Sequence, residues 1–315
     1  MKKNKLFVFL RILISLCLLA LLLWLGRDNF AKIGQLLSSV NISIFGLALV
    51  LFLLSIIIMA WRLRLALIVQ GSSFGVGALF SLTLVGLFFS NFMPTSVGGD
   101  LVKGYYISRK NKNKMSSYAS VFVDRVIGVF SLALIASAAL VIGRGDIEHK
   151  FIFWTIGLLL VACIISALCL MNKKLLKKIS GSLGILRLLR ILKVDSLLKR
   201  AYEAINIYIN YKKTIFQLFT LSLVSQFISF FSMYILANSL SLYIPFERIL
   251  LVMPIIIVLC MLPLTMNGLG LREWAFVFFF SPNVGEAAAL SFSLLYLAMF
   301  LLTSLLGGII YLFWR

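Results

Sequence analysis

Long apolar runs separated by short polar segments dominate the pattern of this chain. A membrane-spanning helix needs about 20 predominantly apolar residues, and the runs that meet this requirement are 6–26, 44–61, 117–142, 151–171, 215–239 and 286–313. The pattern therefore predicts about six transmembrane helices. We expect an all-α, polytopic membrane protein in which residues 1–315 form a single integral membrane domain.

Composition supports this interpretation and argues against several other function classes. Hydrophobic residues make up 62% of the 315 positions and charged residues only 13%, whereas a soluble domain has about 25% charged residues. The net charge of +20 would suggest nucleic acid in a soluble protein, but here the cations gather in loops beside apolar runs. His149 is the single histidine, the four cysteines form no CxxC pair, and no Walker A loop occurs. We expect no nucleic-acid partner, metal, cofactor or catalytic residue.

Two further apolar stretches, 76–93 and 249–281, contain breaks and are predicted to be re-entrant hairpins. The lysines of the first five residues place the N-terminus in the cytoplasm, and eleven Lys or Arg against two acidic residues do the same for segment 172–213. A complete crossing by 76–93 would put that segment and the basic residues of 103–114 outside. A hairpin that enters from the cytoplasm and returns keeps both inside. The same count predicts that 249–281 enters from the outer face, and that both termini are cytoplasmic.

The predicted elements form two halves of opposite orientation, residues 1–143 and residues 144–315. Each half has two spans, a hairpin and a third span. The breaks share a crude pattern, PTSVGGD at 94–100 and PLTMNGLG at 263–270. Paired Gly and Pro interruptions at matching positions of two halves indicate an inverted-repeat transporter with its site near the midplane of the membrane.

The two breaks and a nearby Asp-Arg pair supply the candidate substrate-binding residues. Irregular backbone at membrane depth is tolerated only where protein or a water-filled cavity surrounds it. The candidates are Pro94, Gly98, Gly99, Asp100, Lys103, Asp124, Arg125, Pro263, Asn267, Gly268, Gly270, Arg272 and Glu273. In the functional interpretation, Lys103 and Arg272 join the N-termini of half-helices in holding an anionic group such as a phosphate. In the alternative, each neighbouring acid merely neutralises its cation, and the glycines serve tight packing.

Charged residues elsewhere have more than one interpretation. Asp124 and Arg125 lie near the start of a span, where ionisable residues face a bundle interior or reach the interface. Arg62 and Arg64, at the inner end of the second span, are interpreted as topological anchors that contact lipid headgroups. In segment 172–213, leucines and isoleucines recur at helical spacing beside lysines, which predicts a basic amphipathic helix on the anionic inner leaflet.

At NFMPTSVGGDLVKGYYISRK, VDRVIG and LPLTMNGLGLREW the chain resembles a known membrane family. It is similar to the transmembrane domain of lysylphosphatidylglycerol synthase/flippase, the multiple peptide resistance factor, and to that domain's short stand-alone relatives. The resemblance covers nearly the whole chain, although the family often has Glu where Asp124 stands. In the full-length relatives this domain moves an aminoacylated phospholipid between leaflets, and a separate cytosolic domain transfers lysine from lysyl-tRNA to phosphatidylglycerol. The sequence ends directly after the last span, at Trp314 and Arg315, so the resemblance favours lipid translocation over lysyl transfer.

We therefore expect a flippase-like protein of the bacterial plasma membrane. Its substrate would be an anionic or aminoacylated phospholipid, or a polyprenyl-phosphate lipid. One alternative is a phosphatidylglycerol lysyltransferase with a role in resistance to antimicrobial peptides. Another is a membrane subunit that supports a separately encoded synthase or a lipid-linked glycosyl transferase.

Overall fold

The protein is described by a computed structural model that covers residues 30–93, 98–111, 114–142, 157, 204, 206–262 and 264–313. Within these residues every longer element is a helix, which confirms the all-α class. The elements are α2 (Phe30–Ser38), α3 (Ile42–Val69), α4 (Val76–Ser90), α5 (Gly98–Lys110), α6 (Lys114–Ile142), η2 (Ile207–Asn210), α11 (Lys212–Ser239), α12 (Phe246–Met261), η3 (Met266–Gly268), α13 (Leu271–Val284) and α14 (Glu286–Leu312).

Four of these helices, α3, α6, α11 and α14, are long and apolar enough to cross a membrane. Each has 27 to 29 residues, which corresponds to about 40 Å of helix. They confirm the predicted spans 44–61, 117–142, 215–239 and 286–313. The predicted spans 6–26 and 151–171 lie outside the described residues.

The surface of α3 shows what surrounds the protein. Large apolar side chains are exposed along this helix, among them Ile42 (81%), Val50 (61%) and Trp61 (50%). A soluble monomer rarely exposes so much contiguous apolar surface, whereas lipid tails accept it. The helix also continues to Val69, eight residues beyond the predicted end, because its two arginines are accommodated inside the protein.

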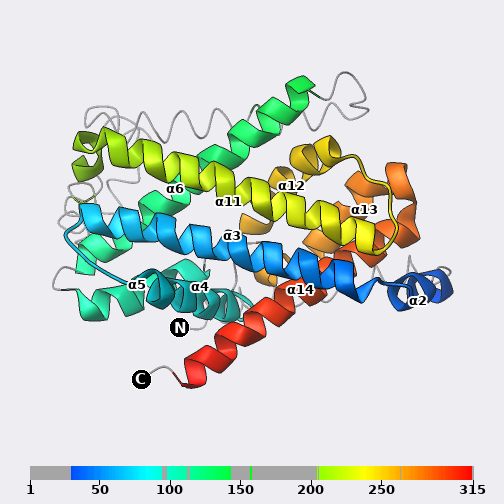
Figure 1. Cartoon of the computed structure of the whole chain (residues 1–315), viewed down its shortest axis with the longest axis horizontal. Coiled ribbons are helices and arrows are strands. Elements are labelled where there is room, and N and C mark those ends of the chain that lie inside the picture. Colours follow the sequence, from blue (N-terminus) through cyan, green and yellow to red (C-terminus); the bar gives the residue numbers. More distant parts are fainter. Residues whose placement is uncertain are drawn as a thin grey trace.

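The two predicted hairpins are present, with one correction to the first (Figure 1). The stretch 76–93 does not enter and return by itself. Its helix α4 is one arm of the hairpin, and the polar helix α5 packs against it as the returning arm. An arm of 13 to 15 residues is about 20 Å long and cannot cross the hydrocarbon core. Because α5 carries several charged residues, the pattern of apolar runs does not predict this arm.

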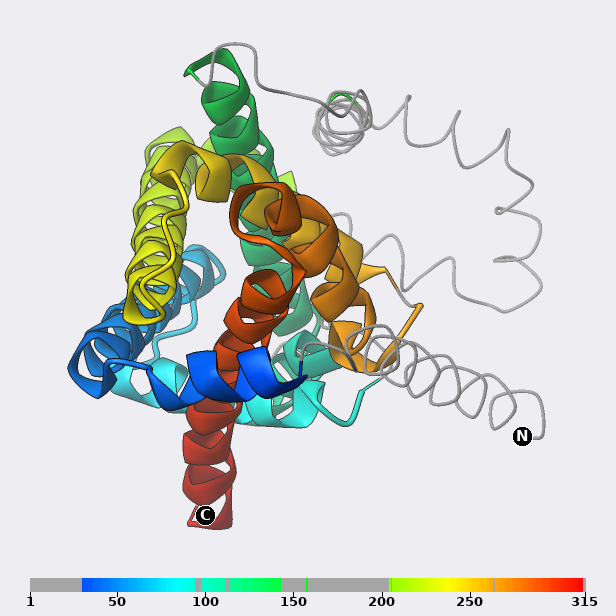
Figure 2. The ribbon, with the colours of Figure 1, turned by 90° about the vertical axis from the view of Figure 1, so that its right-hand side faces the viewer.

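The second hairpin consists of α12 and α13 and enters from the opposite end of the molecule (Figure 1). The end where the first hairpin enters has exposed cations on α5, α6 and α11, and we call it the basic end; they are Arg109, Lys110, Lys114, Lys212 and Lys213. At the opposite end α2 packs beside α14 (Figure 2). The structure thus has two short helical hairpins directed toward each other from opposite ends.

The hairpins are exchanged between the halves of the bundle. The long helices α3 and α11 run side by side and make the most extensive helix–helix contact of the described structure. Helix α4 packs against α14, and α12 packs against α6. Each hairpin therefore packs on the last long helix of the other half. Most neighbour relations stay the same when α3, α4, α5 and α6 are exchanged with α11, α12, α13 and α14; within the described residues, the packing of α6 on α11 has no comparable counterpart between α3 and α14. This pattern agrees with an inverted repeat, although the repeat itself and the half boundaries at 143 and 144 stay predictions.

Only the last residues of segment 172–213 are described, and they dock on α3. Gln70 donates a hydrogen bond to the carbonyl of Ala204 (2.5 Å), and the Tyr208 hydroxyl donates to the carbonyl of Ala66 (2.7 Å). Burial raises the pKa of Tyr208 to about 12, so the hydroxyl keeps its proton for this bond. The predicted amphipathic helix lies outside the described residues, and its role at the leaflet surface stays a prediction.

Candidate functional site

The tips of the two hairpins touch inside the bundle. Asn267 of η3 donates a hydrogen bond from Nδ2 to Oδ1 of Asn91, directly after α4, at 2.8 Å. Asn91 in turn donates to the hydroxyl of Ser304 on α14 (2.5 Å). Asn267 has a φ of 47°, a left-handed conformation that Asn tolerates better than most residues, and Gly268 (79°) and Gly270 (82°) complete the turn. Three elements from both halves are therefore joined at one polar point.

A buried ionic cluster begins at the first turn of α5. Asp100 lies 2.6 Å from the ammonium of Lys103 and 3.5 Å from Nε of Arg125 on α6. The two residues are three positions apart in α5, which places them on one face of the helix. The helix N-terminus adds a partial positive charge beside the same carboxylate. Asp100 holds α5 against α6 in the interior.

The same cluster continues through Arg62, which corrects its interpretation as a surface anchor. Arg62 is only 3% exposed and donates to both carboxylate oxygens of Asp124, at 2.6 and 2.8 Å. A third donor of Arg62 reaches the hydroxyl of Ser222 on α11 (2.6 Å). A planar guanidinium has the donor geometry for such bidentate pairing. One residue therefore joins α3, α6 and α11.

Arg64 also differs from the prediction of a headgroup anchor. It is partly buried, and its Nε donates to the carbonyl of Phe74 at 3.1 Å. This bond fixes the connection between α3 and α4. The two arginines of α3 are therefore structural partners of other elements, because an arginine inside an apolar helix is stable only when its donors are satisfied.

The cluster carries more positive than negative charge. Among the described residues it contains three cations, Arg62, Lys103 and Arg125, and two carboxylates, Asp100 and Asp124. The surplus is one positive charge. The Arg125 side chain is the most accessible member, at 32% exposed.

A small cavity of about 140 Å³ adjoins this surplus charge. Arg62, Arg125 and Gln226 line it together with apolar residues of α3, α6, α11 and α12. The amide of Gln226 donates to the carbonyl of Gly128 (2.8 Å), while its Oε1, like Nε of Arg125, makes no hydrogen bond within the described structure. Buried polar atoms normally have partners. The cavity therefore has unused hydrogen-bonding capacity beside a cation.

The second hairpin has charges of a different kind. Glu273 accepts a hydrogen bond from the backbone N–H of Gly270 (2.6 Å) and pairs with Arg272 (2.5 Å), which also lies over the ring of Tyr296 on α14. Arg272 and Glu273 are 5% and 1% exposed. This group is neutral and caps α13. Here the alternative interpretation, an acid that neutralises its neighbouring cation, agrees with the geometry.

The glycines at the breaks permit close packing in this conformation. A side chain on Gly99 would collide with the carbonyl of Gly86 on α4, and one on Gly98 with Met93. A Cβ on Gly268 would lie 2.7 Å from the sulfur of Cys260. The close approach of α4 and α5 depends on the first of these contacts.

The structure brings Asp100, Lys103, Asp124 and Arg125 into one cluster and places Arg272 and Glu273 in a separate one. Pro94 and Pro263 lie outside the described residues. Asn91, Arg62, Ser222 and Gln226 were not among the predicted site residues. An arginine within an apolar helix was a signal that could have identified Arg62. Among the described residues, no group of three or more His, Cys, Asp or Glu could hold a metal ion.

Comparisons with known proteins agree with this architecture. The family model described as "Lysylphosphatidylglycerol synthase TM region" matches residues 8–307. The chain is also 29% identical over 175 residues to the UPF0104 membrane protein MJ1595 of Methanocaldococcus jannaschii. That alignment covers 54% of this chain and 51%, about half, of the relative. No solved structure matches the chain. The match over nearly its whole length shows that the chain belongs to the family of the lysylphosphatidylglycerol synthase transmembrane region.

Proposed function

We propose that the protein moves an anionic lipid between the leaflets of a bacterial plasma membrane, with the basic end in the cytoplasm. The headgroup crosses between the two hairpins, and the acyl chains stay in the bilayer. A phospholipid, including an aminoacylated one, and a polyprenyl-phosphate lipid share the phosphate that this proposal requires. The observation that carries it is the ionic cluster with one surplus positive charge near the tip of a re-entrant hairpin.

The arrangement of the hairpins supports the proposal. Broken helices that enter from opposite faces and meet inside a bundle are typical of transporters with alternating access. The contact between Asn91 and Asn267 closes the space between the tips, and separation of the tips would open it. Because each hairpin packs on the last helix of the other half, a shift of one half moves the opposite hairpin.

The charges support an anionic substrate. An unneutralised cation at membrane depth is costly, and a phosphate beside Arg125 would neutralise the surplus. The adjoining cavity of about 140 Å³ is too small for a whole lipid but lies beside the accessible cation. Nε of Arg125 lies 3.5 Å from Asp100 without a hydrogen bond and would donate one to a phosphate oxygen.

The test measures lipid sidedness in proteoliposomes that hold the purified full-length chain and a phosphatidylglycerol labelled with a fluorophore on its acyl chain. A membrane-impermeant quencher reports the rate at which inner-leaflet lipid reaches the outer leaflet. Arg125→Gln makes the cluster neutral and leaves Asp100 paired with Lys103, so we expect transport about tenfold slower, equivalent to about 1.4 kcal/mol. Lys213→Gln, which removes an exposed charge at the basic end, is the control and should transport normally.

Two results would contradict the proposal. One is equal transport by liposomes with and without the wild-type chain. The other is normal transport by Arg125→Gln, which would show that the surplus charge plays no part in transport. Appearance of lysylated lipid with the purified chain and lysyl-tRNA alone would instead identify the lysyltransferase alternative.

A further inference from the structure

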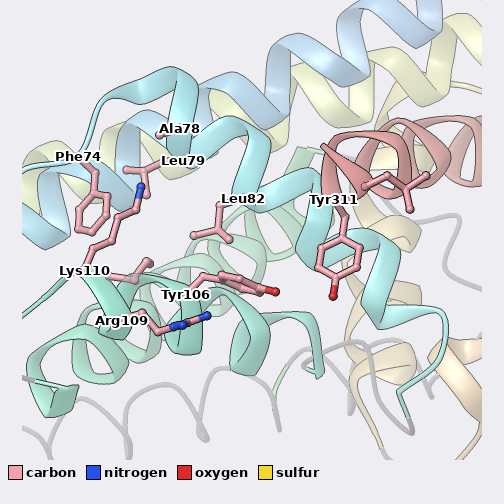
Figure 3. Close-up of a pocket in the computed structure, with 10 residues that line it drawn as sticks. Phe74, Ala78, Leu79, Leu82, Tyr106, Arg109, Lys110 and Tyr311 are labelled. Carbon is pink, nitrogen blue, oxygen red and sulfur yellow. The ribbon is translucent and has the colours of Figure 1, made fainter. Parts of the chain in front are cut away.

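A second cavity lies at the basic end, apart from the ionic cluster. It has a volume of about 570 Å³ and is formed by α4, α5, the connection before α4 and the last turn of α14. Figure 3 shows its lining, in which Arg109 lies beside Tyr106, and Lys110 extends toward Phe74 and Leu79. Two adjacent cations therefore share one cavity with apolar and aromatic side chains.

The two cations are available for a ligand. Arg109 and Lys110 are exposed, and no carboxylate of the described residues lies within ion-pair distance of either. They occupy the last turn of α5, where they offset the partial negative charge of the helix C-terminus. Two full charges exceed the roughly half charge of the helix end, so the cavity attracts an anion.

The walls of the cavity favour a lipid over a free anion. Leu79 and Leu82 are buried at its base, and Leu312 of α14 is 79% exposed at its rim. An apolar wall of this kind accepts part of an acyl chain, while the cations at the membrane surface hold the phosphate. A soluble phosphate would gain nothing from the leucines.

The rim of the cavity is held in position by bonds from outside it. Arg64 fixes the backbone of Phe74, and Asn111 fixes the end of α5, because its Nδ2 lies 2.6 Å from the hydroxyl of Ser72 and 3.1 Å from that of Ser116. These contacts join the connection before α4 to α3, to the end of α5 and to the start of α6. A preformed site binds more tightly because less ordering is needed.

We propose that this cavity binds an anionic glycerophospholipid taken from the leaflet at the basic end, before its headgroup moves to the ionic cluster. The order of these two steps rests on the proposed function, whereas the binding itself does not. Arg109 and Lys110 would hold the phosphate, and one acyl chain would lie along Leu79, Leu82 and Leu312.

Binding is measured by native mass spectrometry on the full-length chain in detergent, titrated with dioctanoyl-phosphatidylglycerol. The variant Arg109→Gln/Lys110→Gln removes both charges at similar side-chain size, and we expect about tenfold weaker binding. The matched control, Lys212→Gln/Lys213→Gln, removes two adjacent exposed charges at the same end but outside the cavity, and should bind like wild type. Ala78→Trp fills the cavity from an exposed position and should weaken binding without any change of charge.

Two further probes separate the chemical sources of the phosphate. Glycerol 3-phosphate supplies the anion without acyl chains, and dioctanoyl-phosphatidylcholine supplies the chains without net negative charge. Weak binding of both supports a lipid site. Equal binding of glycerol 3-phosphate and phosphatidylglycerol would overturn it, and so would equal weakening by the two double variants. If Arg109→Gln/Lys110→Gln loses binding in a chain that moves no lipid, the site stands and only the proposed function fails.

Discussion

Asn267 donates a hydrogen bond to Asn91 across the tips of two hairpins that enter the bundle from opposite ends. The residues are 176 positions apart, and each follows or lies within a break between helices. Ser304 accepts from Asn91, so the last long helix takes part in the same contact. This point connects both halves of the chain through side-chain hydrogen bonds.

Loss of the tip contact should destabilise the protein. Asn91→Ala leaves the amide of Asn267 and the hydroxyl of Ser304 without a partner in the interior, which costs roughly 1–3 kcal/mol. We expect a lower midpoint of thermal unfolding in detergent, followed by tryptophan fluorescence. Asn283→Ala, at an exposed position in the last turn of α13, should leave the midpoint unchanged. Equal midpoints for the two variants would show that the tip contact adds no stability.

Arg62 and Asp124 should behave as a coupled pair. Either Arg62→Met or Asp124→Asn leaves one charge buried without its partner, which costs roughly 3–5 kcal/mol. The double variant removes both charges and should be less destabilised than the sum of the two single variants. Reversible unfolding in mixed micelles at increasing SDS measures each free energy. Additive losses would mean that the 2.6 Å pair contributes no coupling.

Two glycines in spanning helices should respond oppositely to alanine. Gly307 of α14 has no room for a Cβ because the carbonyl of Leu84 on α4 lies against it, whereas Gly46 of α3 has nothing within 4 Å. Gly307→Ala should therefore destabilise by about 1–3 kcal/mol through overpacking. Gly46→Ala should be neutral, or more stable by about 0.5–1 kcal/mol, because alanine favours the helix. The same SDS titration measures both, and similar effects would contradict the tight contact of α14 with α4.

The orientation of the protein is open to a labelling test. In a variant without native cysteines, a cysteine at Tyr243, 86% exposed at the opposite end, should react with an impermeant thiol reagent in intact cells. A cysteine at the exposed Lys213, at the basic end, should react only after the cells are permeabilised. The reason is that basic residues are retained on the cytoplasmic side. The reverse pattern would place the basic end outside.

The apolar pattern by itself determined the four long helices in the described part of the chain. The run 286–313, for example, became α14 at Glu286–Leu312 almost without change. In a bilayer every backbone polar group must be satisfied within its own segment, so an apolar run of that length has no alternative to a helix. The positions of the basic residues also predicted that the chain turns back within each half, because a full crossing would place basic segments on both sides of the membrane.

Only the tertiary structure decided which residues pair. Arg62 was placed at a surface by its position in the sequence, yet it pairs with Asp124, 62 residues away, and α5 proved to be an arm of the first hairpin. The helices are apolar on most sides, so their sequence pattern does not specify which side faces which neighbour. The partner of a buried charge depends on that rotation and on the depth at which two helices meet. Both follow from the packing of the whole bundle.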